Sequence, residues 1–320
     1  MRALRSAYEA YRWRWKRRAL IWRAVRARHQ LQPLAVRTGQ IGADAILCLA
    51  CVRDEADRLP RFLDHHRALG VGHFLIVDNA SSDDTPGLLR AQGDVSLWVT
   101  SANYRAARFG MDWIDWLLFR YGHGHWCLTV DADERLVFAD PQGSGLRGLT
   151  RRLDDSGRPA FPALLLDLYP GPDGEGEWFD PGPYGQRWQP ASRSVWIQGG
   201  PRARALFPGA DRRAPTLNKI PLVRWNRRFA HLNAVHTLLP RRLNAVWETA
   251  PSGVLLHDKL LGDVPARAVA ERRRGQHFGR PGDFTDYYDA LAAGVEFHHD
   301  GSLRYSDWRQ LADLGLLSTG

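Results

Sequence analysis

Two aspartates separated by one residue follow an apolar segment near the middle of the chain. Asp131 and Asp133 belong to the sequence DADE, which comes directly after the apolar residues 126–130. Such a run is typical of a buried strand, so both carboxylates are expected where the chain leaves the sheet. Two carboxylates at this spacing can hold one hard cation, and Mg²⁺ or Mn²⁺ bound in this way can neutralise the charge on a leaving phosphate. A solvent-exposed acidic turn is the alternative interpretation.

Two more polar segments follow apolar runs. The sequence VDNASSDDT contains Asp78 and Asn79, and in nucleotide-binding folds an acidic residue at the end of the second strand commonly meets a base or a ribose. Ser82 and Asp83 of the same segment also suit a helix cap. The sequence RDE ends another apolar run, where the guanidinium of Arg53 can meet a phosphate or form a surface ion pair.

Apolar runs alternate with amphipathic segments from residue 46 onward. The expected strands cover residues 46–52, 73–78, 95–100 and 126–130, and the expected helices cover residues 59–69, 104–121, 263–277 and 284–293. Short buried strands separated by helices predict an α/β fold with a parallel, doubly wound sheet. Ligands of such sheets bind outside the carboxyl ends of the strands, where the polar segments lie. Residues 170–190 include ten glycines and prolines, which indicates a functional loop or lid.

The positive charge of the chain is concentrated in its first 30 residues. The chain carries a formal charge of +9, and residues 1–30 contain ten arginines and lysines against one carboxylate, Glu9. The remainder is therefore neutral, which argues against nucleic acid as a partner. The arm is expected to be helical because apolar and aromatic residues recur at steps of three or four, at Leu4, Tyr8, Tyr11, Trp15, Ala19 and Trp22. Such a stripe either packs on the body or lies in an anionic membrane surface.

No apolar run approaches the roughly 20 residues of a membrane span, and the N-terminus lacks the apolar stretch of a secretory signal. The three cysteines are expected to be small core residues, because a chain of 320 residues can bury a core without disulfides. We therefore expect a reduced cytoplasmic protein, whose arm would meet the inner membrane face if it binds lipid.

Three motifs in order give the sequence a resemblance to a known family. RDE at 53–55, FLDHHRALGVGHFLIVDNASSDDT at 62–85 and WCLTVDADERLV at 126–137 resemble the family 2 glycosyltransferases with the GT-A fold. The match is with a bacterial subgroup similar to the family 92 enzymes, over roughly residues 46–300. The resemblance implies a GT-A type sheet, and transfer of a sugar from a UDP- or GDP-sugar to a saccharide acceptor, such as a cell-surface glycan or a lipid-linked saccharide.

The resemblance also implies roles for particular residues. Asp131 and Asp133 correspond to the metal motif, and His257 in the sequence LLHDK looks like a third ligand. Because an imidazole suits Mn²⁺ better than Mg²⁺, manganese is the favoured cofactor. The residues expected to bind the donor are Arg53, Glu55, Asp78, Asn79, Asp83, Arg108, Asp131, Arg202, Lys219 and Lys259.

The catalytic base lacks a clear motif. An inverting transfer, which the resemblance favours, needs a carboxylate or a histidine near the acceptor hydroxyl. The candidates are Asp180, Glu177, Asp167 and His236. We favour Asp180, which belongs to the glycine- and proline-rich loop beside aromatic residues that could stack on a sugar.

Two other functions share some of these features. A nucleotidyltransferase usually carries a glycine-rich loop after the first strand, whereas RDE stands there and the next glycine is Gly70. An inactive module that recruits a glycan or a membrane would not need both aspartates and His257. The expected organisation is a basic arm (1–30), a linker (31–45), a transferase domain (46–300) and a tail (301–320). The domain divides into a nucleotide-binding half (46–140) and an acceptor half (141–300).

Overall fold

A computed structural model describes residues 2–207, 214–249, 252–274 and 285–319, with the side chains of residues 2–7, 248–249 and 285 left out. One mixed sheet forms its centre, in the order β1-β4-β3-β2-β5-β11-β7-β14-β6. The bounds are β1 Gln32–Ala35, β2 Leu47–Val52, β3 His73–Asp78, β4 Val95–Val99, β5 Trp126–Thr129, β6 Glu134–Val137, β7 Ala160–Tyr169, β11 Asn218–Arg224 and β14 Gly253–His257.

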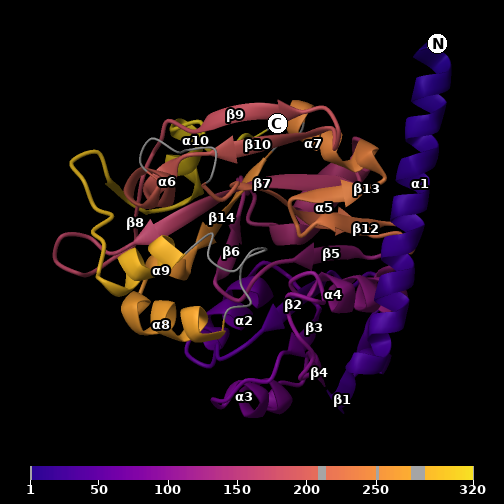
Figure 1. The fold of residues 1–320 in the computed structure, drawn as a ribbon, viewed down its shortest axis with the longest axis horizontal. Helices are drawn as coiled ribbons and strands as arrows, with labels where there is room; N and C mark the ends of the chain where they lie inside the picture. The colour runs from indigo at the N-terminus through magenta and orange to yellow at the C-terminus, as the bar shows by residue number, and fades with distance from the viewer. Residues whose placement is uncertain (1, 208–213, 250–251, 275–284, 320) are drawn as a thin grey trace.

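The direction of the strands confirms the predicted fold class. Strands β4, β3, β2 and β5 are parallel neighbours, and β7 and β14 are parallel to each other. Strand β11 lies antiparallel between β5 and β7, so these two groups run in the same direction. The chain is therefore an α/β protein with a mostly parallel sheet flanked by helices and a basic helix at the N-terminus, an arrangement consistent with the expected GT-A type (Figure 1).

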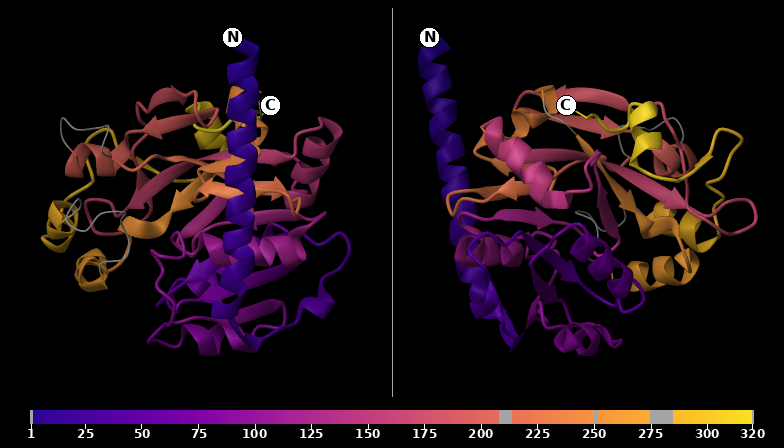
Figure 2. Two further views of the ribbon diagram at one scale, coloured as in Figure 1. Left: turned by 45° about the vertical axis from the view of Figure 1, so that its right-hand side comes forward. Right: turned by 180° about the vertical axis from the view of Figure 1, so that it is seen from behind.

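The described helices cover both faces and both ends of the sheet (Figure 2). They are α1 Arg2–Ala27, α2 Leu59–Ala68, α3 Thr85–Ala91, α4 Met111–Leu117, α5 Gly145–Asp155, α6 Gly200–Leu206, α7 Val246–Thr249, α8 Val264–Arg274, α9 Thr285–Ala292 and α10 Trp308–Asp313. The helix expected over residues 104–121 is shorter, because the α-helix begins only after Gly110, whose φ of 78° is left-handed. Residue 277 and residue 284, at the expected ends of the last two helices, lie outside the described residues.

Two short strand pairs lie beside the sheet, and a third joins it through an antiparallel pairing with β7. β9 Gly185–Gln189 pairs with β10 Ser194–Gln198, β12 Ala230–Asn233 pairs with β13 Thr237–Leu239, and β8 Trp178–Phe179 pairs with β15 Leu303–Arg304. The glycine- and proline-rich segment 170–190 therefore contains strand structure at β8 and β9.

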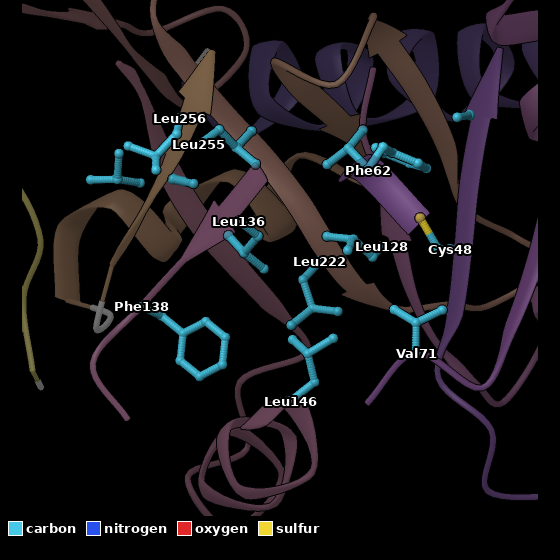
Figure 3. Close-up of a cluster of buried hydrophobic side chains, with 14 of the residues drawn as sticks. Cys48, Phe62, Val71, Leu128, Leu136, Phe138, Leu146, Leu222, Leu255 and Leu256 are labelled. Atoms are coloured by element: carbon cyan, nitrogen blue, oxygen red, sulfur yellow. The ribbon is translucent and has the colours of Figure 1, made fainter. Parts of the chain in front are cut away.

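Alternate residues of the central strands enter different cores. Cys48 and Phe74 pack on one face with residues of α2 and α5, such as Phe62 and Leu146 (Figure 3). On the other face, Leu47, Leu75 and the α4 residue Trp113 belong to a second cluster, which the C-terminal end of α1 joins through Ala27. The period of two along each strand produces this division.

The segments before and after the expected domain are part of the folded body. The segment expected as a linker contributes β1, which pairs antiparallel with β4 at one edge of the sheet. The C-terminal tail buries Leu311 and Leu317 in the core that contains Cys48. Cys48 and Cys127 are buried free thiols, and Cys51 is half-buried. None of the helices in the described ranges has the length and apolarity needed to cross a bilayer.

Candidate active site

The carboxylates of DADE lie in the turn that joins β5 to β6. The backbone N–H of Glu134 donates to the carbonyl of Asp131 at 3.0 Å, which closes the turn. Strand β6 begins at Glu134 and pairs with β14 so that Glu134 lies opposite His257, the last residue of β14. His257 also lies opposite Asp167 of β7. Sheet register therefore brings residues from three distant segments to one point.

Three of these residues can share a cation. Asp133, Glu134 and His257 each offer one ligand atom, and these atoms lie within 4.8 Å of one another. Nε2 of His257 lies 3.3 Å from Oδ2 of Asp133. Two carboxylate oxygens and one imidazole nitrogen suit Mn²⁺, so this donor set fits the metal that the resemblance implies.

The cluster differs from the predicted one in a single residue. Asp131 was expected as a ligand, but the third ligand atom within 4.8 Å belongs to Glu134. Asp131 accepts a hydrogen bond from Nζ of Lys219 at 3.0 Å. Lys219 also donates to Glu134. Burial raises the pKa of Glu134 to about 7, although the positive charge of Lys219 opposes the rise. Lys219 therefore balances part of the negative charge of the turn.

A buried ion pair lies behind His257. Nδ1 of His257 lies 2.6 Å from Oδ1 of Asp167, and Nε of Arg202 donates to the other oxygen of Asp167 at 2.7 Å. All three side chains are buried. Burial would raise the pKa of Asp167, but the charge of Arg202 and the bond to His257 lower it to about 2. A carboxylate on Nδ1 fixes the ring and leaves Nε2 directed to the Asp133 side.

A cavity of about 250 Å³ lies beside the cluster. Its walls come from the end of β2, the turn that contains Asp131 and Asp133, and helices α8 and α9. The cations in its lining are Arg53, Arg58, Lys259, Arg267 and Arg274. Five cations facing acidic residues make a site for an anion bridged by a divalent cation, which is the charge pattern of a bound diphosphate.

The side of the cavity near Asn79 is closed by α8. Nη2 of Arg274 donates to Oδ1 of Asn79 at 2.8 Å, and the same guanidinium lies over the ring of Tyr104 with its carbon 5.1 Å from the ring centre. The amide nitrogen of Asn79 donates to two backbone carbonyls, of Thr100 and Ala102. Asn79 is therefore fixed by hydrogen bonds at both ends of its amide, one of them from Arg274.

The predicted donor-binding residues fall into two groups. Those that line the cavity are Arg53, Glu55, Asn79, Asp131 and Lys259. Those that do not line it are Asp78, Asp83, Arg108, Arg202 and Lys219. Burial raises the pKa of Glu55 to about 7, and the nearby charge of Asp133 adds to the rise.

The residues outside the cavity have local structural roles. Asp78 accepts hydrogen bonds from the backbone and side chain of Ser81, and Asp83 accepts from the backbone N–H groups of Ala56 and Thr85. Arg108 lies 3.3 Å from Asp112 and donates to the carbonyl of His231, which joins α4 to β12. A left-handed φ of 55° at Arg108 turns the chain there.

None of the four candidate bases lines this cavity. Asp180 lies in a second, larger cavity of about 450 Å³, where it accepts from Nε of Arg204 at 3.4 Å and lies 3.4 Å from Nε2 of His299. Glu177 pairs with Arg135 at 2.9 Å. The structure therefore does not bring Asp180 together with Asp131 and Asp133.

The two remaining candidates are held inside the fold. Asp167 is bonded to Nδ1 of His257 and is therefore not free to act as a base. Nδ1 of His236 donates to the carbonyl of Asn218 at 2.6 Å, and burial, followed by the charge of Lys219, lowers the pKa of His236 to about 4.

Several residues of the site had no sequence signal of their own. Glu134 stood beside the aspartates as an ordinary acidic neighbour, and only its register opposite His257 makes it a ligand candidate. Arg58 follows shortly after RDE, and this spacing could have suggested it as a further residue of the site. Arg267, Arg274 and Tyr104 reach the cavity from segments that the sequence pattern did not connect with it.

Comparisons with known proteins reveal weak structural likenesses. No family model matches the chain, and no curated protein matches it. A mannosyltransferase of Pyrobaculum calidifontis, PcManGT, solved with GDP-mannose and Mn²⁺, is 15% identical, with a TM-score of 0.37 over 89% of this chain and 80% of that one. HddC of Yersinia pseudotuberculosis is 7% identical, with a TM-score of 0.28 over 57% of this chain and 74% of that one. With scores this low, the fold assignment rests on the strand order of the sheet.

Lys219→Met is expected to destabilise the protein more without metal than with it. The substitution leaves Glu134 buried without its counter-charge, which costs about 3–5 kcal/mol. A cation on Asp133, Glu134 and His257 would replace the missing charge, so Mn²⁺ should raise the Tm of the variant more than that of the wild type. Thermal unfolding with and without Mn²⁺ measures this, with Arg90→Met, on the exposed surface of α3, as the control. Equal shifts for both variants would remove Glu134 from the ligand set.

Proposed function

We propose that the chain is a metal-dependent glycosyltransferase. It would move a sugar from a nucleotide-diphosphate donor, a UDP- or GDP-sugar, to a hydroxyl of a saccharide acceptor. The observation that supports this function best is the cluster of Asp133, Glu134 and His257 at the edge of a cavity lined by five cations. Two carboxylates and an imidazole favour Mn²⁺ over Mg²⁺ as the cofactor.

The residues of the chain would bind and orient the donor. When bound, the metal ion would act as a Lewis acid for the departing diphosphate. Arg53, Arg58 and Lys259 line the cavity as counter-charges for phosphate oxygens. Asn79 lies where a nucleoside is expected, next to Arg274 and Tyr104. Asp167 keeps the ring of His257 in place.

We propose a cell-surface glycan or a lipid-linked saccharide as the acceptor, with inverting chemistry and a cytoplasmic location. Asp180 as the base stays a prediction, and it requires the acceptor to occupy the cavity shared by Asp180, Arg204 and His299. A carboxylate that serves as base must lie within hydrogen-bonding reach of the acceptor hydroxyl.

Calorimetry with a panel of UDP- and GDP-sugars, with and without Mn²⁺, tests the donor. We expect binding that depends on Mn²⁺, followed by release of the nucleoside diphosphate when saccharides are added. Release of pyrophosphate from a nucleoside triphosphate and a sugar phosphate would indicate a nucleotidyltransferase instead. No nucleotide binding at any Mn²⁺ concentration would indicate an inactive module.

Arg53→Gln is expected to weaken donor binding by about 10- to 100-fold, because a charge-assisted bond to phosphate is lost. Among the described residues, its guanidinium contacts Asp54 and the carbonyl of Asn79, both at 3.4 Å, so the fold should tolerate the change. Arg90→Gln, on the exposed surface of α3, is the matched control. Calorimetry of both variants with Mn²⁺ and the same nucleotide sugar measures the difference. Equal affinities for both variants would place the phosphates elsewhere.

A further inference from the structure

Helix α1 is attached to the body by one face only. It runs along one side of the molecule and extends past it at the N-terminal end (Figures 1 and 2). Leu20, Ala24 and Ala27 are buried, and the helix contacts α4 and β12. Arg23 anchors this face through an ion pair with Asp112 at 2.8 Å. These residues, and not the aromatic stripe, make the packing surface.

The aromatic stripe of α1 faces solvent. Tyr8, Tyr11, Trp15 and Trp22 have exposed fractions of 63%, 53%, 51% and 67%. At about 100° per residue, these four side chains fall within about 60° of one another, on the side of the helix roughly opposite to the buried residues. The stripe is therefore a continuous exposed surface, and packing on the body is not its role.

Cations border this stripe on both sides. The guanidinium of Arg12 lies over the ring of Tyr8 at 5.8 Å, and that of Arg18 lies over Trp15 at 5.3 Å. Among the side chains described in residues 8–27, Arg23 is the only one with an ion pair to a carboxylate. The arm as a whole has ten cations against Glu9. Its charge is therefore largely left for an external anion.

The neighbouring body adds to the positive charge. Arg228 and Arg242 lie close enough to Arg17 to lower its pKa, together with Arg14, Arg18 and, most of all, burial. The guanidinium of Arg241 lies over the ring of Trp13 at 5.0 Å. Trp13 and Arg17 lie on the body-facing side of the helix, so this cluster adds to the positive charge of the arm but does not face the lipid.

We infer that α1 is a membrane-surface helix that docks the protein on an anionic lipid bilayer, with Tyr8, Tyr11, Trp15 and Trp22 turned toward the lipid. Amphipathic aromatic rings are favoured at the boundary of head groups and acyl chains, and arginines beside them meet the phosphates. A second copy of the arm would leave the charge uncompensated. Nucleic acid would neutralise the charge, but it would not account for the exposed aromatic stripe.

The docked orientation leaves the candidate active site accessible. Helices α8 and α9, which line the cavity, lie on the opposite side of the body from α1 in Figure 1 and in the right-hand view of Figure 2. A bilayer along α1 would therefore not cover the cavity, and nucleotides from the aqueous phase could enter it. The inference does not depend on the proposed transferase function.

Co-sedimentation of the full chain with vesicles tests the inference. We expect binding to vesicles of phosphatidylglycerol and phosphatidylcholine, little binding to phosphatidylcholine alone, and loss of binding in high salt. Trp22→Ala should weaken binding about tenfold, because it removes a large buried aromatic surface from the bound state. Arg12→Gln combined with Arg18→Gln should weaken it roughly 30-fold, at about fivefold for each cation.

Matched controls distinguish binding through this surface from non-specific adsorption to vesicles. Trp188 is similarly exposed on β9, so Trp188→Ala should bind vesicles like the wild type. Arg147→Gln with Arg151→Gln removes two exposed cations from α5 and should also leave binding unchanged. The inference is overturned if the wild type does not bind anionic vesicles, or if the control variants lose as much binding as the arm variants. Dimerisation through the stripe, or binding of duplex DNA in preference to vesicles, would overturn it too.

Discussion

Asp133→Asn is expected to reduce sugar transfer by about a thousandfold or more, the scale of losing a preorganised charge at a reacting phosphate. Asp133 is the carboxylate whose oxygen lies 3.3 Å from Nε2 of His257, so it belongs to the cation cluster in both the sequence and the structure. The neutral amide would hold a divalent cation only weakly. The rate of nucleoside diphosphate release, measured across a range of Mn²⁺ concentrations, checks the expectation.

Asp131→Asn is the informative companion to this variant. Its carboxylate is held by Lys219 at 3.0 Å and is absent from the cluster, so its loss should cost clearly less than the loss of Asp133. Glu134→Gln should behave like Asp133→Asn, because Glu134 offers a ligand atom. If Asp131→Asn were as damaging as Asp133→Asn while Glu134→Gln was mild, the ligand set expected from the sequence would hold and the one proposed from the structure would be wrong.

Arg202→Met is expected to lower the free energy of unfolding by about 3–5 kcal/mol, since it removes the guanidinium counter-charge of the buried Asp167 and leaves only its contact with His257. Nε of Arg202 donates to Asp167 at 2.7 Å, and both side chains are buried. Urea unfolding measures the loss. The freed carboxylate would also hold the ring of His257 less firmly, so Mn²⁺ affinity should fall by about 10- to 100-fold.

Arg204→Met provides the control within the same helix. Arg204 lies two residues away, its side chain is 40% exposed, and its pairing with Asp180 is longer, at 3.4 Å. Although Asp180 is buried, the exposed guanidinium and the longer distance make this pair weaker, with an expected contribution of about 1 kcal/mol. Equal losses of stability for the two variants would show that the buried pair of Arg202 and Asp167 contributes no more to stability than the pair of Arg204 and Asp180.

The fold and the first part of the site could be predicted because they depend on local patterns. Apolar runs separated by amphipathic helices specify a parallel sheet, and DADE after such a run places its carboxylates at the sheet edge. His257 followed from the resemblance to a family, and the structure places it beside Asp133. Helix α1 also followed from its periodicity.

The remaining site residues depend on pairing between distant segments. Glu134 becomes a ligand candidate only because β6 pairs with β14, and Asp167 reaches His257 only through the register of β7. Arg202 was expected at the donor, yet a buried carboxylate 35 positions earlier in the chain holds it. No local pattern carries such information, because side-chain partners across a sheet are set by tertiary packing.

In the arm, too, the sequence does not determine which residues become buried. Its sequence predicts a stripe from Tyr8 to Trp22 but does not say which face of the helix the body takes. Small residues on the other face, Ala24 and Ala27, allow close packing on the body. The larger aromatic stripe is consequently the one that remains exposed.

The most direct test of the central claim is a crystal structure of the protein soaked with Mn²⁺ and a panel of UDP- and GDP-sugars, with the metal located by anomalous scattering. The account predicts a manganese peak in contact with Asp133, Glu134 and His257, and a diphosphate between that peak and the cations Arg53, Arg58 and Lys259. A nucleotide bound away from this cavity, or a manganese ion that touches neither Asp133 nor His257, would contradict it.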